Sequence, residues 1–114
     1  MATKQSTIDF LAEQIQNAGN VRYQKMFGEY ALYCDGKVVA LVCDDQLFIK
    51  KTEAGQHFLD SSYEAPPYPG AKNYLQVPED KWDDADWLVD FIRETTISLP
   101  IPKPKKKKQP LNRK

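Results

Sequence analysis

The sequence predicts an α+β domain with two layers, in which a mainly antiparallel sheet of about five strands carries three helices. Helix-spaced apolar residues occur near both ends of the chain, and a strong hairpin signal lies between two β-forming runs. The strands follow one another in the middle of the chain instead of alternating regularly with helices. That order is typical of an antiparallel sheet with helices packed on it.

The first predicted element is a helix that begins at Ser6. Asp9 stands three residues later, as in a capping box, and Gly19 ends the helix. Apolar residues recur between them at helical spacing: Ile8, Leu11, Ala12, Ile15 and Ala18. The helix is therefore amphipathic and packs through one side.

The central part of the chain predicts a strand over 21–27, a tight turn or bulge at Gly28, and a β-hairpin over 29–43. Asp35-Gly36 provides the hairpin turn, because both residues tolerate a positive φ, and this turn pairs Cys34 with Lys37. Cys43 then lies about 20 Å further along the strand. An internal disulfide is not expected, and two free thiols fit a reducing compartment.

The second half of the chain predicts a fourth strand, a short helix, a loop, a fifth strand and a long final helix. Thr52 is the expected cap of the short helix, and Asp44-Asp45 is a weaker turn signal before the fourth strand. The predicted ranges are 46–50 for the fourth strand, 53–60 for the short helix, 65–70 for the Pro-rich loop, 72–77 for the fifth strand and about 83–98 for the final helix.

Both faces of the hairpin are apolar. Alternation along the strand places Val38, Ala40 and Val42 on one face, and Val39, Leu41 and Cys43 on the other. Three helices, one of them about two turns long, cover one face of the sheet. The other face is therefore expected to meet a second subunit, most simply in a twofold homodimer.

Charge divides the chain into a folded domain, 1–102, and a basic Pro/Lys tail, 103–114, expected to be extended and disordered. The domain holds 9 Lys/Arg against 16 Asp/Glu, and the tail holds 7 Lys/Arg and no acid. Neither a secretory signal nor a membrane-spanning run is present, so a cytoplasmic protein without membrane insertion is expected. The basic tail residues are Lys103, Lys105, Lys106, Lys107, Lys108, Arg113 and Lys114.

Three roles for this tail stay open. It could contact nucleic acid weakly and without sequence preference, with a log-log salt slope of roughly −4 to −6. It could instead be a solvated segment that folds back on the acidic domain, or it could approach a membrane surface. The folded body supplies no recognition helix rich in Arg, Asn or Gln.

No residue pattern predicts catalysis, a cofactor or a metal. His57 is the one histidine, and Cys34 and Cys43 are interpreted as packing residues, so neither a Cys/His dyad nor a zinc site is expected. The acidic run around Asp83 lacks the glycine and final glutamate of an EF-hand loop. Acidic residues at this place stabilise the start of a helix, because their charge offsets the dipole of the exposed backbone N–H groups.

The run Met-Phe-Gly-x-Tyr-x-Leu-Tyr, followed by Asp-Gly, resembles the N-terminal domain of the TfoX/Sxy competence regulators, with similarity over about residues 6–98. Its residues are Met26, Phe27, Gly28, Tyr30, Leu32, Tyr33, Asp35 and Gly36. The resemblance implies a fold like that of secretion chaperones, frequent dimerisation, a link to regulation of competence genes, and no catalytic residue. Full regulators carry a C-terminal domain, whereas this chain ends in the basic tail.

Two function hypotheses follow. The first is a non-enzymatic regulatory or interaction module, stand-alone and dimeric, that binds a protein partner whose identity the sequence does not give. The second is a nonspecific nucleic-acid-associated protein that uses the lysine-rich tail.

Overall fold

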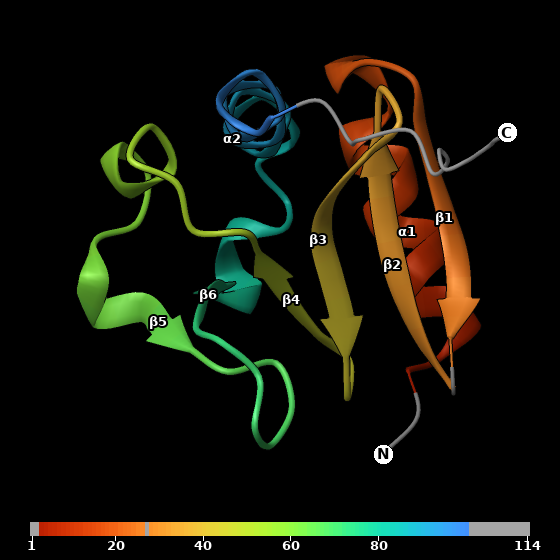
Figure 1. The fold of residues 1–114 in the computed structure, drawn as a ribbon. Helices are drawn as coiled ribbons and strands as arrows, with labels where there is room; N and C mark the ends of the chain where they lie inside the picture. Colours follow the sequence, from red (N-terminus) through yellow and green to blue (C-terminus); the bar gives the residue numbers. More distant parts are fainter. Residues whose placement is uncertain (1–2, 27, 101–114) are drawn as a thin grey trace, which may run out of the picture.

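In the computed structural model, which describes residues 3–26 and 28–100, one six-stranded antiparallel sheet carries two α-helices on the same face (Figure 1). The strand order is β1-β2-β3-β4-β6-β5. The helices are α1 (Gln5–Ile15) and α2 (Ala85–Ser98), and the strands are β1 (Val21–Met26), β2 (Glu29–Cys34), β3 (Lys37–Cys43), β4 (Gln46–Ile49), β5 (Glu64–Ala65) and β6 (Tyr74–Val77). The predicted α+β class is confirmed.

The predicted counts of five strands and three helices are wrong. The segment 53–60 forms a 3₁₀ turn, Gly55–His57, instead of a helix. The N-cap residue of this turn is Ala54, which makes no side-chain cap, and the predicted cap Thr52 lies two residues earlier, where its hydroxyl accepts the amide N–H of Gly55 at 2.9 Å. A Cβ at Gly55 would lie 3.1 Å from the Phe91 ring. Glycine therefore lets this turn approach α2 closely, and it also disfavours continuation as a helix.

The additional strand, β5, has only two residues, which pair with β6 at the sheet edge. So short a strand has no alternation that a sequence pattern can reveal.

The prediction that Ser6 caps the first helix is also wrong, because the helix begins one residue earlier and its cap comes from a distant turn. The N-cap residue, Lys4, makes no side-chain cap. Instead, the Asp45 carboxylate in the β3–β4 turn accepts the Lys4 amide N–H and the Thr7 hydroxyl, each at 2.9 Å. A contact between residues 41 positions apart in the chain replaces the local capping box.

We expect Asp45→Ala to lower the stability of the domain more than Asp45→Asn. Alanine removes both hydrogen bonds and disfavours the positive φ of 59° at this position, which asparagine tolerates. The same two bonds, first that from Lys4, lower the pKa of Asp45. Because the folded pKa is depressed, this stabilisation is present above the ordinary aspartate pKa and is lost as the pH falls through the folded value.

Urea unfolding of the native protein and both variants, at neutral pH and below about pH 4, measures these effects. Asp44→Asn, one residue earlier in the same turn, is the matched control. Equal stability of the native protein and Asp45→Ala at neutral pH would show that the turn does not cap the helix.

The β2–β3 hairpin follows the prediction at its turn. Asp35 and Gly36 have φ of 52° and 82°, and Cys34 pairs with Lys37. One β-bulge interrupts the register after this turn, since Tyr33 pairs with Val38 but Leu32 pairs with Ala40.

The bulge changes which residues share a face. Val39 is the extra residue, and it lies in the core together with Ala40 and Val42. The predicted grouping of Val38 with Ala40 and Val42 is therefore wrong, because a residue inserted in one strand reverses the alternation on either side of it.

The core lies between the sheet and the two helices. Buried residues of α1 and α2, among them Leu11 and Phe91, pack against buried residues of β2, β3, β4 and β6. Lys37 supports the end of α2, because its ammonium group donates to the carbonyls of Thr96 and Leu99 at 2.8 and 3.0 Å. Such a cation satisfies carbonyls that have no partner within the helix.

Candidate interaction surfaces

The sheet face opposite the helices, here called the open face, is the first candidate surface. Directly paired residues of an antiparallel sheet share a face. From the register and the core residues, eleven residues of β1 to β4 belong to the open face: Arg22, Gln24, Met26, Glu29, Ala31, Tyr33, Val38, Leu41, Cys43, Gln46 and Phe48. Most of these side chains carry no charge.

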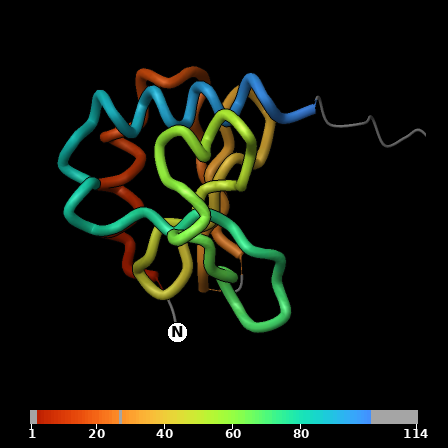
Figure 2. Tube along the Cα trace, turned by 90° about the vertical axis from the view of Figure 1, so that its left-hand side faces the viewer, coloured from red at the N-terminus to blue at the C-terminus, as the bar shows by residue number. Residues whose placement is uncertain are grey.

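The open face contains a mainly apolar hollow of about 470 Å³. Six residues line it: Met26, Glu29, Tyr30, Leu41, Cys43 and Tyr68. The loop after β5, which carries Tyr68, lies on the side of the sheet away from α1 (Figure 2). Met26 and Tyr68 are 40% and 55% exposed, so two large apolar side chains stand beside a cavity that other apolar side chains line.

The two charged residues among the eleven are held by contacts within the chain. The Arg22 guanidinium lies 4.7 Å from the Tyr33 ring centroid, as in a cation–π pair. Glu29 accepts the Thr3 hydroxyl at 2.6 Å and the Asp44 amide N–H at 3.0 Å. Their charges have opposite sign, so these eleven residues have no net charge, although the domain is acidic.

Cys43, in the wall of the hollow, is a poor nucleophile. Burial raises the pKa of its thiol to about 11, and the negative charges of Glu29 and Asp44 act in the same direction. Cys34, on the opposite face of the sheet, also has a raised pKa because it is buried. Both thiols are free, and neither has the lowered pKa that characterises a catalytic thiolate.

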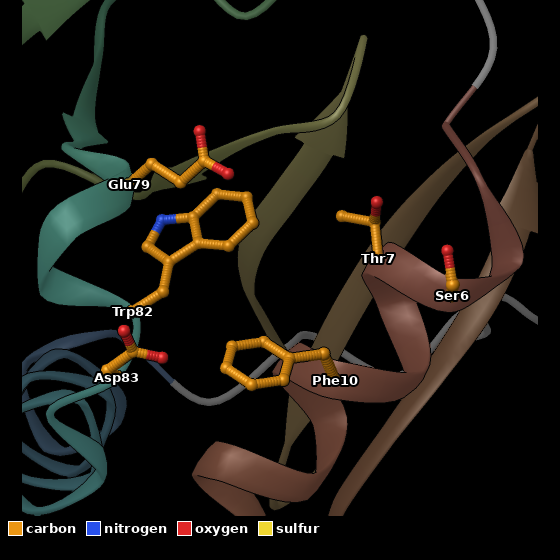
Figure 3. Close-up of a pocket in the computed structure, with 6 residues that line it drawn as sticks. All are labelled: Ser6, Thr7, Phe10, Glu79, Trp82 and Asp83. Carbon is orange, nitrogen blue, oxygen red and sulfur yellow. The ribbon is translucent and has the colours of Figure 1, made fainter.

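A second candidate surface is a groove of about 290 Å³ between α1 and the segment before α2 (Figure 3). It is lined by Ser6, Thr7, Phe10, Glu79, Trp82 and Asp83. The Trp82 ring lies between the Phe10 ring and the Glu79 side chain, with Asp83 beside it and the two hydroxyls across the groove. The groove therefore combines two aromatic rings with two carboxylates, a chemistry that suits a cation.

Trp82 is held firmly in this groove. Its indole N–H donates to the Val77 carbonyl at 3.3 Å, and its own carbonyl accepts from the Gln14 side chain at 2.8 Å. Phe10 on α1 is 37% exposed. Sequence analysis missed this groove, because nothing in the chain order indicates that Phe10 lies beside Trp82.

The family-motif residues have structural positions. Tyr30 and Leu32 lie in the core, Gly28 has a φ of 83° in the β1–β2 turn, and Asp35-Gly36 forms the hairpin turn. Met26 and Tyr33 lie on the open face, and Tyr30 also borders the hollow although it is buried in the core. Phe27 lies outside the described residues, as do Lys103, Lys105, Lys106, Lys107, Lys108, Arg113 and Lys114.

The described part of the chain gives little support for a metal site, a catalytic histidine or a membrane-spanning helix. Within residues 3–26 and 28–100, no three His, Cys, Asp or Glu side chains gather as a metal site would require. His57 is exposed, and it lies in the 3₁₀ turn before β5. Among the same residues, no helix has both the length and the apolar character needed to cross a membrane.

Fold and surfaces together define a small α+β domain with one helix-covered sheet face and one open face that carries an apolar hollow. The model of the TfoX N-terminal domain matches residues 13–97, and the chain belongs to this family. A protein from Spirochaeta aurantia, described as an uncharacterized 12.7 kDa protein in the trpE 5′ region, is 44% identical over 108 residues. The alignment covers 95% of this chain and 93% of that relative. The family is not a known enzyme family.

Proposed function

We propose that the protein is a non-enzymatic regulatory or interaction domain whose copies associate in pairs through the open face. The observation that carries this proposal is the apolar hollow with Met26 and Tyr68 exposed beside it. In a twofold pair, Met26 and Tyr68 of each copy face the hollow of the other copy. The same surface therefore provides both the side chains that are bound and the cavity that binds them.

Charge favours a second copy as the occupant. Residues 1–102 hold seven more acids than bases, so two copies repel each other through most of their surfaces. The eleven strand residues of the open face have no net charge. Two acidic copies therefore meet there with little like-charge repulsion.

Family membership supports a regulatory role for this pair in the control of competence genes, through a further protein partner. A cytoplasmic location belongs to the same proposal, because two free buried thiols suit a reducing compartment.

The test of the proposed pair is the mass of the full chain in solution, from light scattering over a concentration series. We expect a dimer for the native protein. The double variant Met26→Glu with Tyr68→Asp places negative charges inside the contact, and we expect its dimer dissociation constant to rise at least about 100-fold.

Both substituted residues are exposed, so the variant retains the core. Tyr63→Asp is the matched control, because Tyr63 is 39% exposed but does not line the hollow. A monomeric native protein, or a control that dissociates as readily as the double variant, would contradict the proposed contact.

A further inference from the structure

The groove between Phe10 and Trp82 lies close to the start of α2, and the basic segment 101–114 follows the end of the same helix. We propose that this groove binds a lysine side chain from the chain's own segment 103–108, so that the tail is held against the acidic domain. This site is separate from the open face and does not depend on the proposed dimer.

The side chains of the groove match a lysine. The Phe10 ring, 37% exposed, offers a π face to an ammonium group and apolar contact to its methylene stem, while Glu79 and Asp83 supply the opposite charge. Trp82 is 7% exposed, so it forms the buried wall of the groove and contributes mainly apolar contact. Hydroxyl groups of Ser6 and Thr7, across the groove, add hydrogen-bond acceptors. The molecule shows the same kind of contact nearby, where the Lys81 ammonium lies 5.5 Å from the Trp87 ring centroid.

Carboxylates mark a path from the end of α2 to the groove. Asp86, Asp90 and Glu94 are exposed and recur every four residues, so they form one acidic row along the solvent side of the helix. Asp90 is partly neutralised by Arg93 at 3.5 Å. Glu79 and Asp83 of the groove come just before this helix in the chain, and the segment that follows the helix carries seven positive charges and no acid.

The length of the segment is sufficient. The fourteen residues of α2 span about 21 Å at 1.5 Å per residue. From Leu99 to Lys108, nine residues of extended chain cover up to about 30 Å at about 3.3 Å each. Lys106, Lys107 and Lys108 can therefore reach the groove of the same molecule.

Lysines of the tail that are bound in the groove are less available to other anionic partners. A polyanion such as nucleic acid competes with the groove for the same lysines, and salt weakens both contacts. The groove thereby makes tail binding to any acidic partner weaker than the number of lysines alone predicts.

The experiment compares NMR spectra of the full chain with those of a variant in which Lys103, Lys105, Lys106, Lys107 and Lys108 are all replaced by Gln. At low salt we expect the Trp82 indole N–H resonance to differ between the two proteins, and the difference to vanish near about 0.5 M salt. The Trp87 indole N–H is the internal control.

Two charge variants locate the contact. Glu79→Gln with Asp83→Asn should lose most of the tail-dependent shift. Asp9→Asn with Glu13→Gln also removes two negative charges, but from α1, where Asp9 accepts a hydrogen bond from Gln5. This control variant should retain the tail-dependent shift. Phe10→Ala should reduce the shift without changing the charge.

Identical Trp82 resonances with and without the tail charges would overturn the proposal. Equal losses in both double variants would overturn it as well, because they would indicate diffuse attraction to an acidic surface. A shift that weakens on dilution would mean that the lysine comes from a second copy, which contradicts binding of the chain's own segment.

Discussion

Replacing Phe91 by alanine is expected to lower the free energy of unfolding by about 3–5 kcal/mol. Phe91 is fully buried in α2. Its ring stacks on that of Phe58, with the centroids 4.9 Å apart, and lies nearly perpendicular to that of Trp87, with the centroids 5.4 Å apart. Gly55 lies against the same ring. The substitution therefore leaves a cavity where α2, the 3₁₀ turn and the sheet meet, and aromatic contacts are lost with it.

Urea unfolding of the native protein and the variant measures this loss. Ile97→Ala in the same helix is the control, because Ile97 is 68% exposed and its replacement should change the free energy by no more than about 0.5 kcal/mol. A Phe91→Ala protein as stable as the control would show that the aromatic cluster does not hold α2 on the sheet.

The second large effect concerns Cys43, which is expected to be alkylated at least about tenfold more slowly in the folded protein than in the unfolded chain near pH 8. Its pKa rises from 9.0 to about 11, so the thiolate fraction falls about 100-fold. The greater nucleophilicity of a more basic thiolate offsets part of this loss, and limited access slows the reaction further. Rates at each cysteine follow from peptide mass spectrometry after timed alkylation, with the denatured chain as reference.

The pH dependence supplies a check. The alkylation rate at Cys43 should keep rising towards pH 11, because the thiolate fraction does. The raised pKa also stabilises the fold: this contribution to the free energy of unfolding is present below about pH 9 and is lost as the pH approaches 11. Glu29→Gln removes one of the two nearby negative charges and should speed the reaction modestly. A native rate close to the denatured rate would indicate that the hollow does not raise the pKa of this thiol.

The sequence by itself determined the elements whose signals are local. Asp35-Gly36 lies between two β-forming runs, and the structure has the predicted pairing of Cys34 with Lys37, because the turn residues alone provide the positive φ that the hairpin requires. The long helix before Leu99 also follows from its periodic apolar residues and its acidic start. Five residues of the family motif lie in this hairpin: Tyr30, Leu32, Tyr33, Asp35 and Gly36.

Tertiary structure alone decided the features that depend on distant residues. The cap of α1 comes from Asp45, and the β3 bulge that places Val39 beside Ala40 in the core has no sequence marker. Segment 53–60 stays a turn because Gly55 packs on Phe91. Both candidate surfaces likewise join separate parts of the chain: Met26 with Tyr68, and Phe10 with Trp82. Local propensity fixes short-range geometry, whereas the free energy of packing selects which distant residues meet.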